Sequence, residues 1–403
     1  MSEPFQAVKV SERVYWVGAV DWNIRDFHGY QTGRGSTYNA FLVTGESNIL
    51  IDTVKKPFFD EMLSRVRSVI GDAGIDCIVS NHAELDHAGA LPDAVRNLGP
   101  KKILTSKMGA RALHDHFGTG LDLSIVKDGE SRSIGGIDFT FLETKMLHWP
   151  DSMVTYLPGD RVLFSQDGFG MHLASTERFS DEIPNEILEQ EGAKYFANIL
   201  LPFSPLVTKL IERIKSLDLR IDILAPDHGP IWRKDTGRMP ELWAKWALQK
   251  PKAKAVIVFD SMWQSTETMA KAIAEGLVEN GISARFMPLQ VFHRSDVATE
   301  LLDAAGFFAG SSTLNKHLLP RMADVLTYIK GLKPRNKMGA AFGSFGWSGE
   351  GSQQVHEMLE SMGVEMVGAP LAARYVPDAN DLESCRQLAT QAATRIFEHI
   401  EDK

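Results

Sequence analysis

A short stretch that mixes histidines with carboxylates is the part of the sequence best suited to chemistry. It reads Asn-His-Ala-Glu-Leu-Asp-His and occupies residues 81–87. Because side chains of an extended chain alternate between two faces, His82, Glu84 and Asp86 would project to the same side. His87 then precedes a run of small residues that is typical of a helix start. Imidazole and carboxylate groups at this density favour a metal site over a solvated charged loop.

The place of this cluster in the predicted fold supports a functional role. Residues 75–80 form an apolar run that predicts a buried strand, so the cluster follows a strand end, where α/β sheets usually place chemistry. Three further potential ligands follow strand-like runs, each near glycine or proline: His148, Asp167 and His228. A lone histidine after a strand is more often structural, but the repeated pattern favours one shared site.

Length and composition indicate a globular protein with more than one domain. The chain has 403 residues, 44% of them hydrophobic and 24% charged. We expect no membrane span, because no apolar run reaches about 18 residues, and no secretory signal is visible at the start of the sequence. The net charge of −9 argues against nucleic acid as a partner.

The cysteine content limits the redox chemistry that this chain can perform alone. Its two cysteines, Cys77 and Cys385, lie in different halves, so a disulfide is not expected and a reducing cytoplasm is favoured. A cysteine-ligated iron–sulfur or rubredoxin-type centre needs about four thiolates, so any such centre must belong to a partner.

The first half alternates strand-like and helix-like segments. Apolar patterning predicts strands, helices and a hairpin turn at residues 8–16, 38–52 (with the turn at 45–46), 57–70, 102–105, 107–117 and 133–142. Two mixed sheets packed between outer helices would suit this order. A basic, proline-containing break at 249–254 separates the first half from the second, so we predict domains at 1–249 and 250–403.

The second half repeats a strand–helix unit. Expected strands lie at 255–259, 284–289, 306–310, 338–343 and 365–371, with helices at 268–279, 297–305, 320–331, 351–362 and 378–400. This alternation predicts a doubly wound parallel sheet. The loop at 261–266 follows the first strand and is rich in hydroxyls, which is weak support for phosphate binding when taken alone. It contains neither a dinucleotide-binding nor a Walker A glycine pattern.

Two more strand-end loops, at 311–315 and 343–350, strengthen that interpretation, and the whole half resembles flavodoxin. By that resemblance the loops would bind FMN. The implied contacts are Ser261, Met262, Trp263, Gln264, Ser265, Thr266, Ser312, Thr313, Leu314, Asn315, Ser344, Phe345, Gly346 and Trp347. Ser261, Gln264, Ser265 and Thr266 would hold the phosphate. Two positions depart from the usual pattern of relatives: Ser312 replaces a proline, and Lys316 replaces a second asparagine.

The first half resembles the metallo-β-lactamase superfamily, whose ligands arise from strand ends in the same order. Hydrolases of that fold carry a histidine where this chain has Glu84. The added carboxylate is a harder donor that favours iron or manganese over zinc. The full set is His82, Glu84, Asp86, His87, His148, Asp167 and His228. Seven ligands are too many for one metal ion and enough for two that share a carboxylate.

The combination of these halves resembles the two-domain flavodiiron proteins. The resemblance implies one iron on His82, Glu84 and His148, a second on Asp86, His87 and His228, and Asp167 between them. It implies reduction of dioxygen to water, of nitric oxide to nitrous oxide, or both.

The same resemblance implies partners and neighbouring residues. Electrons would come from rubredoxin or a similar donor and pass through FMN. The chain would form a head-to-tail homodimer, possibly a dimer of dimers. His28 and Tyr195 match positions near the diiron pocket. The ligand set is shared by oxygen and nitric oxide reductases, so it does not predict the preferred gas.

Two alternatives stay open at this point. One is a zinc hydrolase fused to a flavodoxin-like module, and the other is a flavin carrier whose first half is a scaffold. Iron, zinc or no metal would distinguish the three.

Overall fold

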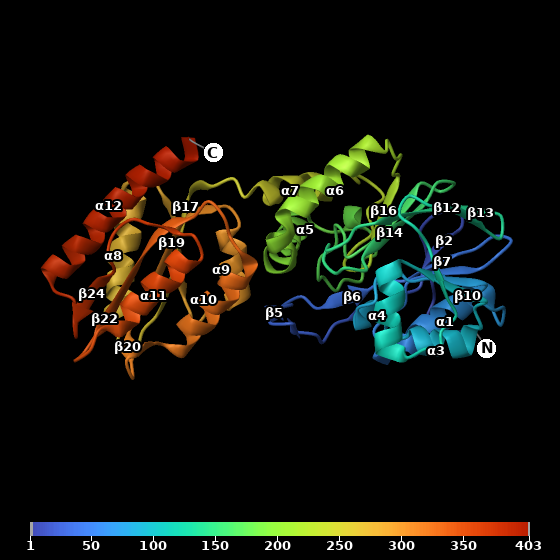
Figure 1. Ribbon diagram of the computed structural model, residues 1–403, viewed down its shortest axis with the longest axis horizontal. Coiled ribbons are helices and arrows are strands. Elements are labelled where there is room, and N and C mark those ends of the chain that lie inside the picture. The colour runs from blue at the N-terminus through green and yellow to red at the C-terminus, as the bar shows by residue number, and fades with distance from the viewer. Residues whose placement is uncertain (1–2, 402–403) are drawn as a thin grey trace. The chain divides into compact units, whose positions relative to one another are not determined.

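The computed structural model describes residues 3–401 and divides into two compact units (Figure 1). The first unit runs to residue 195 and resumes at 205–244, whereas the second takes residues 196–204 and the chain from 245 onward. The domain boundary at 249/250 stays a prediction.

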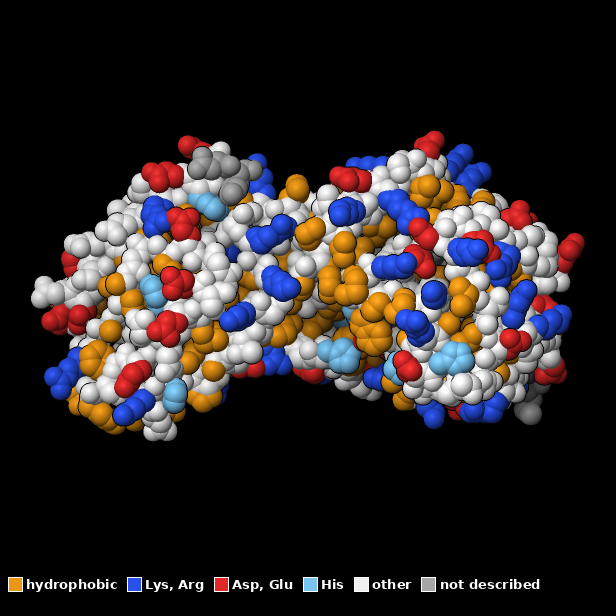
Figure 2. All heavy atoms as spheres, viewed as in Figure 1, with side chains coloured by type: hydrophobic (Ala, Val, Ile, Leu, Met, Phe, Trp, Pro, Cys, Tyr) orange, Lys and Arg blue, Asp and Glu red, His pale blue; other side chains and the backbone are white. Residues whose placement is uncertain are grey.

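Lysine and arginine side chains are interspersed with acidic ones on the face seen in Figure 2, so that face carries no extended patch of one sign among the described residues.

The first unit is a four-layer αββα sandwich, as predicted. One sheet has the order β1-β2-β7-β8-β9-β10-β11. Its strands are β1 (Val8–Lys9), β2 (Val14–Trp16), β7 (Phe41–Val43), β8 (Ile49–Ile51), β9 (Cys77–Val79), β10 (Lys102–Thr105) and β11 (Leu123–Ile125). The other sheet has the order β12-β13-β14-β15-β16. Its strands are β12 (Ser131–Ile134), β13 (Ile137–Glu143), β14 (Met153–Leu157), β15 (Val162–Gln166) and β16 (Ile223–Pro226).

Aromatic and branched side chains fill the space between the two sheets, where the rings of Phe41 and Phe164 lie 5.2 Å apart. The outer face of the first sheet packs on α1 (Phe59–Ile70), α3 (Leu91–Leu98) and α4 (Lys107–Phe117). Beside the second sheet lie α5 (Asn185–Tyr195), α6 (Ser204–Ser216) and α7 (Arg238–Leu248) (Figure 1).

Two predicted strands of this unit are hairpins in the structure. The segment 8–16 is broken by a turn in which the Val10 N–H donates to the Val14 carbonyl at 2.8 Å. The segment 133–142 is interrupted at Gly135 and Gly136, whose φ values of 54° and 74° favour glycine. Alternating apolar residues predicted the extended backbone correctly, but they do not reveal where it reverses direction.

The second unit has the flavodoxin strand order that the sequence predicts. Its sheet runs β18-β17-β19-β22-β23, with β24 also paired to β22, and all pairings are parallel. The strands are β17 (Lys252–Asp260), β18 (Ser283–Pro288), β19 (Ala304–Ser311), β22 (Met338–Phe345), β23 (Glu365–Met366) and β24 (Leu371–Arg374).

Helices cover both faces of this parallel sheet, which is why the middle of each central strand is apolar. On one face lie α8 (Ser265–Glu279) and α12 (Ala379–Glu401). On the other lie α9 (Arg294–Leu301), α10 (Pro320–Leu332) and α11 (Glu350–Ser361) (Figure 1). The helix expected at 297–305 starts and ends earlier, because Ala304 and Ala305 already belong to the buried strand β19.

Across residues 3–401, no helix combines the length and the hydropathy that crossing a bilayer requires.

Candidate functional site

The structure brings all seven predicted metal ligands together in the first unit. The segment 82–87 follows β9 and includes the short helix α2 (Leu85–Ala88), His148 lies between β13 and β14, Asp167 follows β15, and His228 follows β16. Strands of both sheets therefore deliver ligands to one edge of the sandwich. The donor atoms fall into two groups: His82, Glu84, His148 and Asp167 form one, and Asp86, His87 and His228 form the other.

The first group pairs two imidazoles with two carboxylates. Nε2 of His82 lies 3.3 Å from Oε2 of Glu84, and Nε2 of His148 lies 3.2 Å from the same oxygen. The same two nitrogens lie 3.4 Å and 3.0 Å from Oδ2 of Asp167. Two nitrogens and two oxygens thus face one small volume.

The second group repeats the arrangement. Nε2 of His87 lies 3.4 Å from Oδ1 of Asp86, and Nε2 of His228 lies 3.2 Å from Oδ2 of Asp86. These nitrogens lie 3.1 Å and 3.3 Å from Oδ1 of Asp167. Asp167 therefore turns one oxygen toward each group, which is the placement that a bridging carboxylate needs.

Unsatisfied buried oxygens indicate that cations belong in both groups. Both carboxylate oxygens of Asp86 and Oδ2 of Asp167 are buried and accept no hydrogen bond from any residue in 3–401. Burying charged oxygens that accept no hydrogen bond is costly, and a metal ion between them and the nearby imidazoles would offset that cost. A mixed set of imidazoles and carboxylates fits two iron ions.

Neighbouring groups fix the orientation of the ligand imidazoles. Nδ1 of His228 donates to the Thr37 carbonyl at 2.6 Å, and Nδ1 of His82 lies 3.1 Å from Oδ2 of Asp151. Each bond turns Nε2 of its ring toward the metal group, and a proton held on Nδ1 would leave the Nε2 lone pair to a bound metal.

The electrostatics of the site come from the contacts between imidazoles and carboxylates. Burial opposes protonation of His82, but hydrogen bonds to Asp151 and Glu84 outweigh burial and raise its pKa to about 10. For His148, burial is likewise outweighed by Asp167 and Glu84, and the pKa rises to about 9. Surrounding imidazoles overcome the burial of Asp167 and hold its pKa well below its usual range. The site therefore keeps its carboxylates ionised.

The two predicted neighbours of the metal pocket lie beside it. Nε2 of His28 is 3.1 Å from Oε1 of Glu84, although 74% of the His28 side chain is exposed. Tyr195 is buried, and its ring centre lies 6.3 Å from that of His228. Burial, reinforced by the charge of Asp167, raises the Tyr195 pKa well above its ordinary value, so the phenol keeps its proton.

His172 is a third neighbour of the metal pocket. It is fully buried, and its Nδ1 lies 2.8 Å from the Ser36 hydroxyl.

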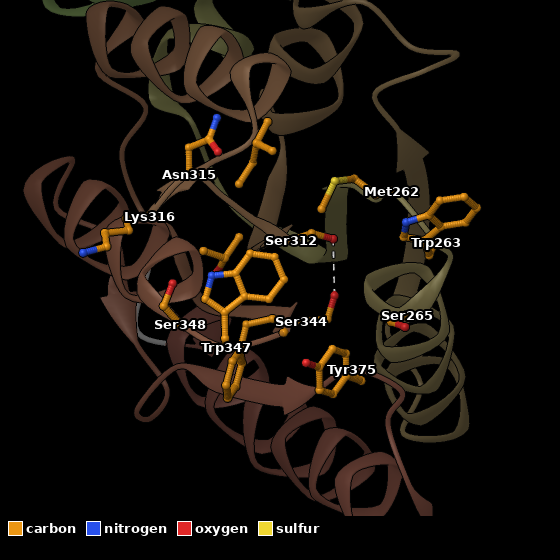
Figure 3. A pocket seen from close by; sticks show the side chains of 14 residues that line it. Met262, Trp263, Ser265, Ser312, Asn315, Lys316, Ser344, Trp347, Ser348 and Tyr375 are labelled. Atoms are coloured by element: carbon orange, nitrogen blue, oxygen red, sulfur yellow. Dashed lines mark hydrogen bonds between the residues drawn. The ribbon is translucent and has the colours of Figure 1, made fainter.

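The second unit contains a cavity of about 750 Å³ at the strand ends (Figure 3). A cavity of this size suits a flavin-sized ligand. Most of the predicted flavin contacts line it: Met262, Trp263, Ser265, Ser312, Thr313, Leu314, Asn315, Ser344, Phe345, Gly346 and Trp347. Ser261, Gln264 and Thr266 do not line it, and Lys316, Ser348 and Tyr375 do so without having been predicted.

The walls of the cavity fit an aromatic ring system and a phosphate. Trp263 and Trp347 are each 89% exposed, an unusual state for indoles that a stacked ring would relieve. The helix α8 starts at Ser265, and no side chain within the described residues caps it. The Ser261 hydroxyl is buried without a partner in residues 3–401. Free amides and a free hydroxyl at a helix start suit a phosphate.

Tyr375 was not predicted to line the cavity, because the strand before it was predicted to end too early in the sequence. The predicted fifth strand ended at residue 371, whereas β24 begins there and continues to Arg374. Tyr375 therefore stands directly after a strand, where its N–H donates to the Phe345 carbonyl at 2.6 Å. Looking for aromatic residues after the last strand would have found it.

Comparisons with known proteins agree with the fold of each unit. The family described as ODP family beta lactamase matches residues 36–229, and the flavodoxin family matches residues 257–388. A nitric oxide reductase of Moorella thermoacetica is 42% identical over 400 residues, covering 98% of this chain and all of the relative. The chain belongs to the flavodiiron protein family.

Two solved structures of this family have the same fold along the whole chain. The rubredoxin oxygen:oxidoreductase of Desulfovibrio gigas superposes with a TM-score of 0.96 at 42% identity, covering 98% of this chain and 99% of that one. The flavodiiron protein of Giardia intestinalis superposes with a TM-score of 0.94 at 31% identity and covers 98% of both chains. The chain is therefore a flavodiiron oxidoreductase, and the comparisons argue against the hydrolase and scaffold alternatives.

Proposed function

We propose that this flavodiiron protein reduces dioxygen to water, nitric oxide to nitrous oxide, or both. Electrons from an external donor pass through FMN in the second unit to two iron ions in the first. The observation that carries the proposal is the placement of Asp167, whose two carboxylate oxygens each face two imidazole nitrogens at 3.0–3.4 Å. One carboxylate between two nitrogen-rich groups is suited to a pair of metal ions.

The ligands divide between the two ions. His82, Glu84 and His148 would hold one, Asp86, His87 and His228 would hold the other, and Asp167 would be shared. When bound, two ferrous ions and a reduced flavin supply the four electrons that dioxygen needs to become water, or the two that convert two nitric oxide molecules to nitrous oxide.

The surrounding residues orient the site and control its protons. Asp151 and the Thr37 carbonyl hold the imidazoles of His82 and His228 through Nδ1. Tyr195 keeps its hydroxyl proton because burial and the charge of Asp167 raise its pKa. It can therefore donate a hydrogen bond to a small oxygen-containing molecule in the pocket. His28, which is exposed and in contact with Glu84, connects the pocket to solvent protons.

FMN would occupy the cavity between Trp263 and Trp347, with its phosphate at the start of α8. Lys316, Ser348 and Tyr375 complete the lining. A rubredoxin-type centre that donates the electrons would belong to another protein, because the two cysteines of this sequence are too few for an iron centre that needs four. Rubredoxin fits that role, and it is named in the relative from Desulfovibrio gigas.

We further propose a head-to-tail homodimer in a cytoplasmic setting. In such a dimer the flavin of one subunit would lie beside the irons of the other. Two buried and unpaired cysteines fit a reducing compartment. Sedimentation of a fully active monomer would contradict the dimer.

Anaerobic turnover with reduced rubredoxin tests the function, with both gases compared on one preparation of known metal content. We expect about two irons and one FMN per chain, and consumption of at least one gas. Two zinc ions per chain with no gas consumption would refute the proposal and support a hydrolase.

A further inference from the structure

Three of the four predicted ligand imidazoles have an acceptor near Nδ1. These pairs are His82 with Asp151 at 3.1 Å, His87 with Asp227 at 3.5 Å, and His228 with the Thr37 carbonyl at 2.6 Å. His148 differs, because its contacts with carboxylates are made through Nε2 and no residue in 3–401 forms a hydrogen bond with its Nδ1. It is also the most exposed of the four, with 13% of its side chain accessible against at most 2% for the others.

The indole of Trp149 packs beside His148. Its ring centre lies 6.2 Å from that of His148 at an interplanar angle of 80°, and 5.2 Å from that of His82 at 90°. The two imidazoles are themselves 5.4 Å apart at 82°. Three rings thus meet nearly at right angles, at separations within the range of about 4.5–7 Å that favours edge-to-face pairs. One half-buried indole therefore borders both histidines of the first metal group.

Backbone hydrogen bonds fix the place of this indole. The Trp149 carbonyl accepts the Ser152 N–H at 3.3 Å, and the Trp149 N–H donates to the Ser152 hydroxyl at 3.3 Å. On the other side of His148, the Leu147 carbonyl accepts a hydrogen bond from Nε2 of Gln166 at 2.8 Å. The residues that flank His148 are thus both held, so the indole forms a fixed wall beside the imidazole.

A fixed wall matters most for a ring that has no hydrogen bond at Nδ1. Such a ring can turn about its Cβ–Cγ bond, because the torsion of that bond has a broad energy minimum. A neighbouring ring narrows the accessible range by contact and adds edge-to-face attraction. We propose that Trp149 is the positioning residue for His148, and that it keeps Nε2 directed at the first metal group. This inference rests on the metal pair of the proposed function and deepens it, because each imidazole of the group then has its own support: a carboxylate for His82 and an indole for His148.

Iron release from the loaded protein to a chromogenic chelator tests this role. We expect Trp149→Leu to release iron about three- to tenfold faster than wild type, because the imidazole loses its wall. Trp149→Phe keeps a ring and should stay within about twofold of wild type. Trp246→Leu is the matched control, since Trp246 is likewise half-buried and packs on the ring of Phe196 at 5.7 Å.

Mössbauer spectra of the same variants, loaded with ⁵⁷Fe, supply a readout that is independent of gas reduction. If Trp149 acts through His148, only the signal of one of the two irons should change in Trp149→Leu. Neither signal should change in Trp246→Leu. A loss of stability alone would not alter the signal of one iron selectively.

Double variants show whether Trp149 acts through His148. His148→Ala removes the ring that Trp149 positions, so Trp149→Leu should then change iron release less than twofold further. Asp151→Asn acts on His82 instead, so its effect should multiply with that of Trp149→Leu.

Iron release from Trp149→Leu within twofold of wild type would overturn the positioning role. The same conclusion would follow from an undiminished effect in the His148→Ala background, or from an equal effect of Trp246→Leu. Far-ultraviolet circular dichroism checks folding, and Trp149→Met, whose long flexible side chain fills more of the space, replaces Trp149→Leu if that variant does not fold. Wild-type protein that holds no iron would refute the proposed function itself, so the two failures are distinguishable.

Discussion

The indole Nε1 of Trp16 donates a 2.8 Å hydrogen bond to Oδ1 of Asn39, deep in the first unit. This bond turns the amide nitrogen of Asn39 toward the loop that carries His228. That nitrogen donates to the carbonyls of Pro226 and Gly229 at 2.7 Å and 2.9 Å. Asn39 therefore clamps the loop on both sides of the predicted ligand His228, although it is not itself one of the predicted ligands.

Asn39→Asp should loosen the second metal group. The carboxylate can still accept the Trp16 bond, but it cannot donate to the two carbonyls. The Pro226 carbonyl loses this donor, and the Gly229 carbonyl keeps only the longer bond of 3.4 Å from the Thr37 hydroxyl. We expect about tenfold weaker iron retention against a chelator, measured as iron per chain, with the FMN content unchanged. Trp16→Phe is the control, because it removes the indole bond and leaves both carbonyl bonds in place. A larger iron loss in Trp16→Phe than in Asn39→Asp would contradict the clamp.

Asp151 supports the first metal group in a similar way. Its Oδ2 accepts the Ala83 N–H at 2.7 Å and lies 3.1 Å from Nδ1 of His82. Asp151→Asn keeps the shape and removes the charge that orients and strengthens the imidazole. Iron affinity should fall by about 10- to 100-fold.

The measurement for Asp151→Asn is a competition titration with a chromogenic chelator. Asp160→Asn provides the control, because Asp160 pairs with Arg13 and Ser11 away from the metal groups. An affinity that stays within twofold of wild type in Asp151→Asn would show that the backbone alone positions His82.

The metal ligands and the flavin site should respond separately to mutation. Glu84→Ala removes an oxygen that faces two imidazoles, and His148→Ala removes one of those imidazoles. Either change should abolish reduction of both gases, measured with an oxygen or nitric oxide electrode, while the flavin absorbance spectrum stays unchanged. Loss of FMN from these variants would mean that the two functions have been assigned to the wrong parts of the chain.

Local sequence patterns were sufficient to predict both architectures and the residues that converge on the metal site. Apolar runs mark strands, and polar residues in the loops that follow them meet at one sheet edge. The ligands His148, Asp167 and His228 could be found by that rule, although the roles of all seven ligands remain predictions. The rule depends only on strand ends, which short-range patterns reveal well.

Contacts between distant segments could not be predicted in this way. Nothing near Asp151 in the sequence indicates that its carboxylate meets Nδ1 of His82, 69 residues earlier. Likewise, nothing near Thr266 in the sequence indicates that its hydroxyl meets that of Ser344, 78 residues later. Such contacts depend on strand order and on how loops fold back. A single sequence does not specify those features residue by residue.

Lys337 is a buried lysine in the second unit, and its surroundings shift its pKa. It is 3% exposed, and its Nζ donates to the Ala304 carbonyl at 2.7 Å. Burial lowers the Lys337 pKa to about 7. The charge of Asp303 opposes this shift, and that of Lys254 adds to it. In the unfolded chain the same lysine would titrate near 10.4.

The pKa difference makes stability depend on pH in a defined direction. Between about pH 7 and pH 10.4 the unfolded chain holds a proton that the folded chain lacks, so the free energy of unfolding should rise with pH. The rise attributable to Lys337 should be on the order of 1 kcal/mol per pH unit. Lys337→Met removes this pH-dependent contribution and loses only one hydrogen bond. The variant should therefore have a higher free energy of unfolding than wild type at pH 7.

The difference in the free energy of unfolding between Lys337→Met and wild type should shrink steadily toward pH 10. Denaturant unfolding of both proteins at several pH values, followed by the fluorescence of the second unit's tryptophans, measures it. Lys330→Met is the matched control, because that lysine is exposed on α10 and should leave the pH dependence unchanged. A gap between Lys337→Met and wild type that stays constant from pH 7 to 10 would mean that Lys337 keeps its proton in the folded protein, through water or movement of β22.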